Sequence, residues 1–152
     1  MPSTSCGFDD VGGGNSGSEL LVMRGPTLLV DIGFDPQYQS SASRLPLAGL
    51  KGLQALIDTG ATESCIDSRL ASQLNLPIVD RLPVSGVHGS EEVNIHLAQI
   101  YVPSLRQVMH GSFAGVHLVA GGQTHWALLG RTFLRGFRMI YDGRTGAVTI
   151  ED

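Results

Sequence analysis

The most informative segment of this chain reads Ala55-Leu56-Ile57-Asp58-Thr59-Gly60-Ala61. Residues 53–57 are mostly apolar and a turn follows at once, so they predict a short strand rather than a helix. This strand would deliver Asp58 at its end. A single Asp-Thr-Gly is weak evidence by itself, because three common residues recur by chance in many chains. The interpretation of Asp58 therefore depends on the segments that accompany this motif elsewhere in the chain.

A second informative segment lies near the other end of the chain and reads Ala127-Leu128-Leu129-Gly130-Arg131-Thr132-Phe133-Leu134. Between the two segments, residues 84–90 contain Gly86 and Gly89 and predict the tip of a hairpin. Residues 27–32, just after Pro26, are rich in β-branched and aliphatic residues and predict a leading strand. The ordered set is far more specific than either segment alone.

This ordered set resembles the retropepsins, the single-domain aspartic proteases of retroviruses and their cellular and bacterial relatives. The resemblance covers roughly residues 25–150. It implies a mostly β fold, namely a closed acid-protease β-barrel with one or two short helices, acting as a homodimer. It also implies that Asp58 is catalytic and that Thr59, Gly60 and Ala61 support the catalytic turn.

The resemblance assigns two further sets of residues. The flap, which closes over a peptide substrate, would comprise Gly86, Val87, His88 and Gly89. Gly130 and Arg131 would be structural residues near the site. In retroviral members the matching arginine pairs with an aspartate just after the catalytic turn, but Thr62 and then Glu63 follow the turn here. Glu63 is therefore the candidate partner of Arg131.

The chemistry explains why a second chain is expected. Hydrolysis of a peptide bond by water needs one group that takes a proton and another that gives one, and two adjacent carboxylates sharing a proton do both. This chain has a single Asp-Thr-Gly. The sequence Asp31-Ile32-Gly33 imitates it, but its aspartate lies within a predicted strand and no hydroxyl follows. The second carboxylate must come from another copy, which implies a homodimer with the site on its two-fold axis.

The remaining sequence predicts one domain with a tail. Residues 1–18 are rich in Gly and Ser, so we expect a flexible tail whose removal leaves the fold of residues 19–152 intact. Residues 35–49 predict a long polar loop. Asp67 is the expected N-cap of a short helix over residues 68–74.

Further strands are expected towards the C-terminus. Residues 93–97 alternate and predict a strand with one buried face, and a change of phase near residues 98–99 suggests a bulge. Residues 113–119 and 126–129 predict two more strands. The last segment predicts a hairpin over residues 138–150, and we expect its final strand to contribute to the dimer interface.

Composition limits the possible partners. Only 16% of the residues are charged and the net charge is -4, which disfavours nucleic acid. No stretch approaches 18 apolar residues, so we expect no membrane partner and a cytoplasmic location. The spacing of the histidines predicts no metal and no cofactor. Cys6 and Cys65 are expected to be reduced thiols.

Two functions fit the sequence. The first is an aspartic endopeptidase that binds an extended peptide or protein substrate across the dimer. The alternative is a non-catalytic module of the same fold that dimerises or binds peptides without cutting them. Intact Asp58, Thr59 and Gly60 favour the enzyme.

Overall fold

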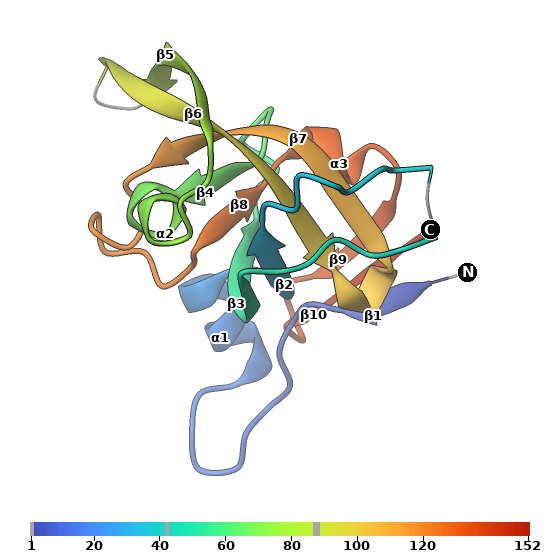
Figure 1. The fold of residues 1–152 in the computed structure, drawn as a ribbon. Coiled ribbons are helices and arrows are strands. Elements are labelled where there is room, and N and C mark those ends of the chain that lie inside the picture. The colour runs from blue at the N-terminus through green and yellow to red at the C-terminus, as the bar shows by residue number, and fades with distance from the viewer. Residues whose placement is uncertain (1, 42, 87–88) are drawn as a thin grey trace.

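The computed structural model describes residues 2–41, 43–86 and 89–152, and within them the chain is mostly β with few short helices (Figure 1). The strands are β1 (Ser3–Ser5), β2 (Thr27–Gly33), β3 (Leu50–Ile57), β4 (Cys65–Asp67), β5 (Ile78–Gly86), β6 (Gly89–Val102), β7 (Gln107–Val116), β8 (Ala127–Leu129), β9 (Arg138–Asp142) and β10 (Ala147–Glu151). The helices are α1 (Gly17–Arg24), α2 (Ser68–Gln73) and α3 (Arg131–Leu134), with a 3-10 turn at Pro103–Leu105.

Six strands close into a barrel, which confirms the predicted fold class. Their order is β2-β3-β8-β4-β7-β6, and an additional pairing between β2 and β6 joins the first strand to the last. β3 and β8 run parallel, with Ala55 opposite Ala127 and Ile57 opposite Leu129. The two informative segments, which lie far apart in the sequence, are therefore neighbours in the barrel wall.

Aliphatic side chains fill the barrel. Fully buried residues from five of its strands contribute to this core: Val30, Ile32, Ala55, Ile66, Ala98, Ile100, Val102, Ala127 and Leu129. Burial of one large aliphatic side chain contributes about 1.5–3 kcal/mol to folding. This core lies directly beneath the ends of β3 and β8, so it gives the loops that follow those strands a rigid base.

The strand predicted at residues 93–97 lies in β6, but the bulge predicted near Ala98 and Gln99 was wrong. The register between β6 and β7 is continuous along their whole pairing. The more deeply buried side includes His96, which is 4% exposed, whereas its odd-numbered neighbours are only partly buried. His96 Nδ1 lies 3.1 Å from the carbonyl O of Leu76, so the imidazole ring is hydrogen-bonded inside the protein.

The flexible tail predicted for residues 1–18 was wrong for most of its length. β1 pairs with β10, and the adjoining Cys6 is 2% exposed. The N–H of Cys6 donates to the carbonyl O of Val148 at 2.9 Å, and the N–H of Phe8 donates to Gly146 at 2.8 Å. Composition cannot reveal such pairing, because backbone hydrogen bonds to a sheet edge require no particular side chains.

The predicted boundary between residues 18 and 19 falls inside α1. Ser16 caps this helix: its Oγ accepts from the N–H of Glu19 at 3.1 Å, and the Glu19 carboxylate accepts from the N–H of Ser16 at 3.3 Å. Such a capping box is visible in the sequence as serine followed three residues later by glutamate, and it marks the start of a helix. Ser18 Oγ donates to the carbonyl O of Gly143 at 2.6 Å, which fastens α1 to the β9–β10 hairpin.

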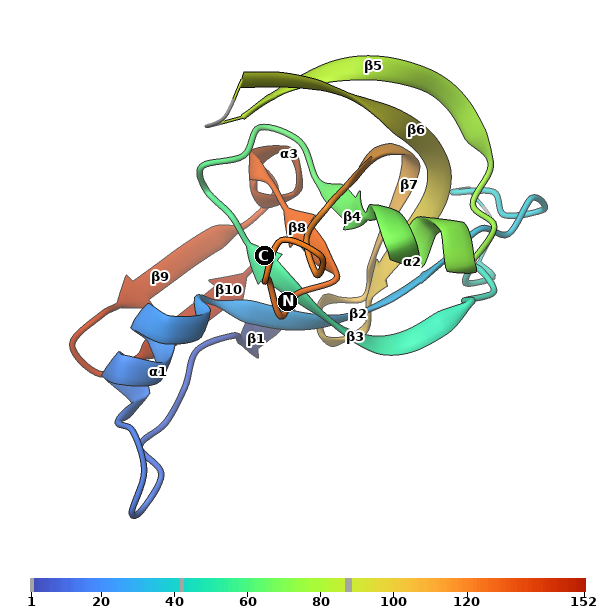
Figure 2. The same ribbon diagram turned by 90° about the vertical axis from the view of Figure 1, so that its left-hand side faces the viewer.

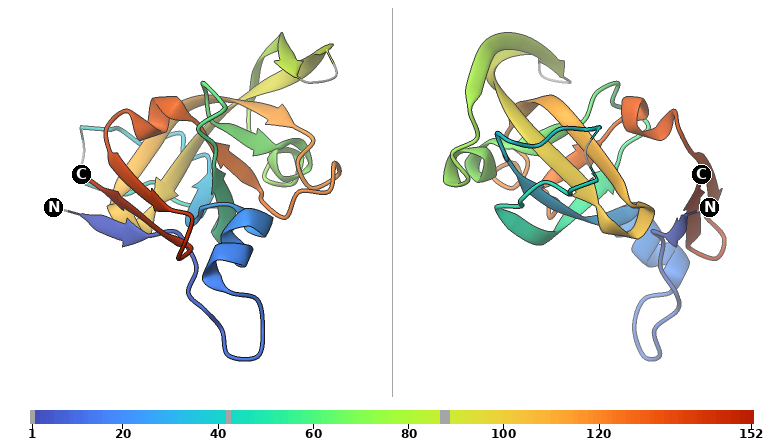
Figure 3. Two further views of the ribbon diagram at one scale, coloured as in Figure 1. Left: turned by 180° about the vertical axis from the view of Figure 1, so that it is seen from behind. Right: turned by 45° about the vertical axis from the view of Figure 1, so that its right-hand side comes forward.

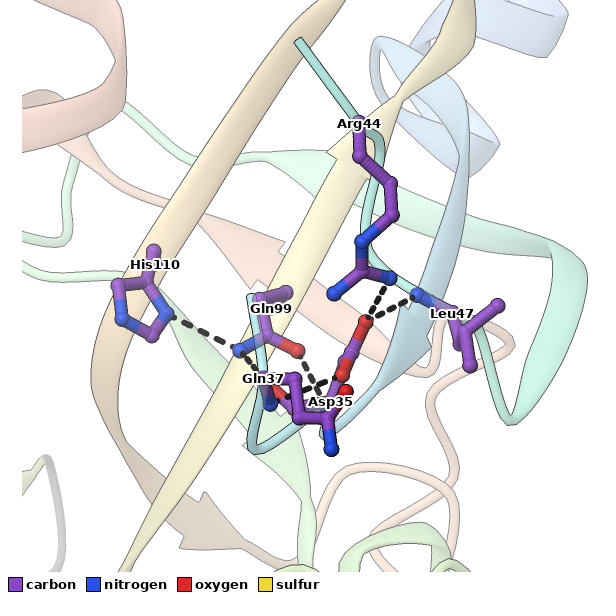
Figure 4. A network of polar contacts seen from close by, with 6 residues as sticks. All are labelled: Asp35, Gln37, Arg44, Leu47, Gln99 and His110. Carbon is purple, nitrogen blue, oxygen red and sulfur yellow. Dashed lines mark hydrogen bonds and ion pairs between the residues drawn. The ribbon is translucent and has the colours of Figure 1, made fainter. Parts of the chain in front are cut away.

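The long connection between β2 and β3 is polar, as predicted, and a buried network holds it in place (Figure 4). Asp35 is 4% exposed and accepts from Arg44 Nη1 at 2.7 Å and from the N–H of Leu47 at 3.1 Å. Gln99 accepts from the N–H of Asp35 at 2.7 Å and lies 3.1 Å from His110. The Arg44 guanidinium holds the pKa of Asp35 below its ordinary value, so this support persists at neutral pH and is lost as the pH falls through that lowered pKa.

Candidate active site

Asp58 lies where β3 leaves the barrel. Its N–H donates to the carbonyl O of Leu129 at 2.9 Å, which extends the pairing with β8 by one residue. Asp58 is half-buried, whereas Thr59 and Gly60 are exposed. The sheet therefore fixes the main chain of Asp58 while the turn that follows remains open to solvent.

The turn itself is tight. The carbonyl O of Asp58 accepts from the N–H of Ala61 at 3.2 Å, and Asp58 Oδ1 accepts from the N–H of Gly60 at 2.9 Å. A Cβ at position 60 would lie 3.1 Å from Asp58 Oδ1, closer than side chains usually come. Glycine at this position leaves room for the carboxylate and for any group that approaches it.

Arg131 holds the turn from the side of α3. Its Nη1 donates to the carbonyl O of Thr59 at 2.7 Å, and its Nη2 donates to Thr62 Oγ1 at 2.9 Å. The candidate partner Glu63 instead accepts from Thr132 Oγ1 at 3.3 Å. Arg131 thus reaches the loop after β3 through neutral acceptors, and Thr62 Oγ1 accepts at the position where the sequence comparison expected a carboxylate.

Ser64 adds a contact that the sequence interpretation missed. Its Oγ accepts from the N–H of Gly130 at 3.0 Å, and its side chain is 6% exposed. The N–H of Arg131 donates to the carbonyl O of Ala61 at 2.9 Å, and that of Thr132 donates to Thr62 at 3.0 Å. These three bonds join the loop after β3 to the start of α3. A small polar residue just before an apolar strand is too common to have signalled this role.

The Gly130→Ala variant tests how closely the two segments must approach. A Cβ at position 130 would lie 2.6 Å from the carbonyl O of Glu63 and 3.0 Å from that of Ala61, so the backbones must move apart. We expect the free energy of unfolding in urea to fall by about 1–3 kcal/mol. Gly136→Ala is the matched control, because a Cβ there meets nothing within 4 Å. Equal stabilities of the two variants would contradict this account.

The predicted flap lies in the β5–β6 hairpin. Gly86 and Gly89 face each other at its tip, and Val87 and His88 lie outside the described residues. The hairpin rises over the barrel, and its tip is on the side where the loop after β3 and α3 emerge (Figure 2). This position suits an element that covers the site.

The similar sequence Asp31-Ile32-Gly33 lies in another part of the fold, in β2. Asp31 is within β2, opposite Tyr101, and its Oδ1 accepts from the N–H of Gly52 at 3.0 Å. Its carboxylate therefore has a structural partner within the sheet. The catalytic role expected for Asp58 rather than Asp31 stays a prediction.

Both cysteines are free thiols. Burial raises the pKa of Cys65 to about 12 and that of Cys6 to about 11. Thiols with such values are protonated at neutral pH and are poor nucleophiles, so Cys65 is not equipped to act as a nucleophile beside Asp58. The half-buried Trp126 packs against the core.

Histidines and acidic residues do not gather into a metal site in the described part of the chain, where no group of three or more His, Cys, Asp or Glu could hold an ion. His125 Nε2 lies 2.9 Å from Thr27 Oγ1, and burial lowers the pKa of this histidine. His117 Nδ1 lies 3.0 Å from Ser68 Oγ. These two imidazoles serve local hydrogen bonds between neighbouring elements.

A hollow beside the barrel does not include Asp58 among its lining residues. It has a volume of about 630 Å³ and lies between β7, α3 and the C-terminus, with Met109, Phe133 and Phe137 among its lining residues. Asp58 instead lies just after β3, is half-buried, and is followed by the exposed residues Thr59 and Gly60.

Comparisons with known proteins find aspartyl proteases. A family model described as "gag-polyprotein putative aspartyl protease" matches residues 48–136. The solution structure of Simian Foamy Virus (mac) protease is similar, with 13% identity, coverage of 72% of this chain and 91% of that chain, and a TM-score of 0.46. EIAV protease complexed with the inhibitor HBY-793 is also similar, with 19% identity, coverage of 73% and 86%, and a TM-score of 0.45. No curated protein matches the chain.

A closed barrel, an Asp-Thr-Gly turn at the end of β3 and a Gly-Arg pair after β8 define a retropepsin-like aspartic protease. The family model spans more than half of the chain, and the chain therefore belongs to the gag-polyprotein aspartyl protease family. Among the described residues, no helix is long and apolar enough to cross a membrane.

Proposed function

We propose that this protein is an aspartic endopeptidase that works as a homodimer, in which each chain supplies one Asp58 carboxylate. The observation that carries the proposal is the Asp58 turn itself. It ends a strand of the barrel, it is anchored by Leu129 and Arg131, and its outer residues Thr59 and Gly60 are exposed.

Two such turns on a two-fold axis would supply the chemistry. Carboxylates a few Å apart cannot both ionise at low cost, so the pair shares one proton. The ionised carboxylate takes a proton from water as the water oxygen bonds to the peptide carbonyl carbon, and the protonated one gives its proton to the carbonyl oxygen. The carbon–nitrogen bond then breaks as the nitrogen takes up a proton. Each chain alone supplies only one of the two carboxylates that this proton exchange requires.

The turn is suited to face a second copy. The carbonyl O of Thr59 is held by Arg131, which fixes the backbone and leaves the exposed threonine side chain on the outer side. Gly60 adds no side chain that could keep two turns apart. We propose that Thr59, Gly60 and Ala61 support the turn in this way, and that Gly130 and Arg131 keep it in position.

The substrate class follows from the shape of the site. An extended peptide would lie between the floor that carries Asp58 and the β5–β6 hairpin, with main-chain hydrogen bonds from the hairpin. We propose Gly86, Val87, His88 and Gly89 as the flap that covers the peptide and excludes water. Neither a metal nor a cofactor enters this chemistry.

Dilution tests the proposal directly. Specific activity on peptide substrates should fall as the chain is diluted through its dimer dissociation constant, because monomers hold one carboxylate each. Cleavage should be fastest on the acidic side of neutrality, where the pair holds one proton, and should resist metal chelators. Peptide cleavage and sedimentation across the same concentrations provide the measurement.

Three outcomes would overturn the proposal. Chains that sediment as monomers yet cleave at an undiminished rate per chain would exclude a shared site. Inhibition by a chelator that zinc reverses would point to a metalloenzyme. Stable dimers that cleave no peptide in a diverse library at any pH would instead support the non-catalytic module.

A further inference from the structure

A second hollow lies at the base of the β5–β6 hairpin, and we call it the hairpin-base pocket. It has a volume of about 570 Å³ and is lined by α2, by β5 and β6, and by the end of β7 with the residues just after it. Asp58, Thr59 and Gly60, which the structure describes, are not among its lining residues. Figure 3 (right) shows α2, in green, beside the base of the hairpin, which rises over the barrel. The pocket is therefore separate from the Asp58 turn, and its size is typical of sites for small ligands.

The inner wall of this pocket contains His96, a buried histidine that is only 4% exposed. Its Nδ1 lies 3.1 Å from the carbonyl O of Leu76, and because that oxygen can only accept, Nδ1 carries the hydrogen. In the neutral ring, Nε2 is then an acceptor. This nitrogen has no hydrogen-bond partner among residues 2–41, 43–86 and 89–152, in which every fully covered side-chain nitrogen or oxygen has one. Nε2 therefore keeps a free surface towards the pocket.

Gly115 in β7 leaves this nitrogen uncovered. A Cβ at position 115 would lie 3.0 Å from His96 Nε2 and 3.1 Å from Cδ2 of the same ring, closer than side chains usually come. The φ of Gly115 is not in the left-handed region, so the backbone itself does not require glycine here. What glycine provides at this position is room beside the imidazole ring, through which ligand atoms can approach Nε2.

Two arginines line the pocket, and only one of them is paired. Arg81 Nε lies 3.1 Å from Glu92 Oε2, and Arg81 Nη1 donates to Asn94 Oδ1 at 3.2 Å. Arg69, the second residue of α2, is exposed. Its side chain makes no ion pair with any residue that the structure describes. The Arg69 guanidinium is therefore available to a negatively charged ligand.

The other acidic side chain of the pocket, Glu91, lies beside a histidine. Glu91 Oε1 is 4.0 Å from His117 Nε2, and His117 Nδ1 is 3.0 Å from Ser68 Oγ. Both carboxylates of the lining thus have a nitrogen-bearing side chain next to them, whereas the guanidinium of Arg69 has no carboxylate beside it. Negative charge on a ligand is favoured on the Arg69 side of the pocket.

The two open groups, the Arg69 guanidinium and His96 Nε2, define the chemistry of a ligand. A guanidinium binds a carboxylate through two parallel hydrogen bonds, and an imidazole acceptor needs an N–H or O–H donor. A fully ionised phosphate or sulfate has no such donor and would leave Nε2 without a partner. The end of a peptide has both features, because its terminal carboxylate lies next to the N–H of the last residue.

We propose that the hairpin-base pocket binds the carboxylate end of a short peptide, with the carboxylate on Arg69 and the N–H of the last residue donating to His96 Nε2. Every cleavage by an endopeptidase creates one new C-terminal carboxylate, so the occupants are the products of the enzyme itself. That source of the peptide rests on the proposed function, whereas the binding does not depend on it.

Occupation of the pocket restrains the hairpin. Arg69 belongs to α2 and His96 to β6, so a peptide end that bonds to both ties the base of the hairpin to the helix. An element that covers a site must open in each turnover, and a ligand that favours one position of this element shifts its population. Accumulating product should therefore lower kcat without competing with the substrate at Asp58.

Peptide titrations test the ligand chemistry. Acetyl-Ala-Ala with a free carboxylate should bind and should shift the nitrogen NMR resonance of His96 Nε2. The same peptide with a terminal amide lacks the charge, and one with an N-methylated last residue lacks the donor. Each should bind at least about tenfold more weakly, and equal affinity of either would refute the assignment. Lactate has the same two groups without a peptide. If it binds as tightly as acetyl-Ala-Ala, the peptide is the wrong occupant.

Two variants with matched controls test the residues. Gly115→Ala places a methyl group over His96 Nε2, and Gly136→Ala is its control, because a Cβ there meets nothing within 4 Å. Arg69→Gln removes the guanidinium, and Arg24→Gln at an exposed site in α1 is its control. Both test variants should bind acetyl-Ala-Ala at least about tenfold more weakly, while the controls bind it like the wild type. Wild-type affinity of Arg69→Gln, which alters only an exposed side chain, would overturn the site.

Binding at the hairpin-base pocket is measured without any need for catalysis. A chain that binds acetyl-Ala-Ala with a shift at His96 but cleaves no peptide would uphold the pocket and refute the protease. A chain that cleaves peptides but shows no shift at His96 with any amount of acetyl-Ala-Ala would uphold the protease and refute the pocket. The two proposals can therefore fail separately.

Discussion

Replacing Asp58 by asparagine should abolish peptide cleavage and leave the fold and the dimer unchanged. Asparagine has the shape of aspartate and retains an Oδ1 that can accept from the N–H of Gly60, as Asp58 does at 2.9 Å. It cannot take or give a proton at working pH. Since general acid–base groups contribute about 10²–10⁴-fold each, we expect kcat/KM to fall by at least about 10³-fold.

Asp31→Asn is the matched control for this variant. Asp31, like Asp58, stands two residues before a glycine, but its Oδ1 accepts from the N–H of Gly52 within the sheet. The Asp31→Asn variant should retain peptide cleavage. Adding an excess of Asp58→Asn chains to the wild type should also lower the activity, because mixed dimers hold a single carboxylate. Wild-type cleavage by Asp58→Asn itself would refute the assignment of Asp58.

Deleting residues 147–152 should cause the second-largest effect. This deletion removes β10, the middle strand of the three-stranded sheet, together with the buried side chains of Val148 and Ile150. Burial of two such side chains contributes about 3–6 kcal/mol, against a total stability of about 5–15 kcal/mol for a typical domain. We expect loss of cooperative thermal unfolding together with loss of association and cleavage.

Point variants distinguish the effect of lost side-chain packing from the effect of the shortened chain. Val148→Ala shortens a side chain that is 1% exposed and should lower the free energy of unfolding by about 1–3 kcal/mol. Val22→Ala makes the same chemical change at a site that is 81% exposed and should lie within about 0.5 kcal/mol of the wild type. A truncated chain that unfolds cooperatively at the wild-type temperature would show that β10 is dispensable.

Local features of the fold could be predicted because the interactions that stabilise them join residues only a few positions apart in the sequence. Asp67 caps α2 through its Oδ2, which accepts from the N–H of Leu70 at 3.1 Å. The C-terminal hairpin was predicted from its turn residues and appears as β9 and β10. The capping box at Ser16 was also visible in the sequence, although the surrounding Gly and Ser content concealed it.

Features that depend on distant partners could not be predicted in the same way. Residues 3–5 form a strand only because β10 offers them an edge. His96 turns inwards because the carbonyl O of Leu76 meets its ring. Arg131 bonds to Thr59 and Thr62 rather than to Glu63, since the way α3 meets the loop sets which acceptors its guanidinium reaches.

The sequence by itself determined the class of the protein and the position of Asp58 at a strand end, because both follow from motif order, and its count of one Asp-Thr-Gly predicts the need for a second copy. Only the tertiary structure decided that β8 lies beside β3 and that β10 is paired on both sides, which leaves β9 as the edge. The physical reason is that strand pairing joins backbone groups far apart in the chain, and these groups are alike in almost every residue.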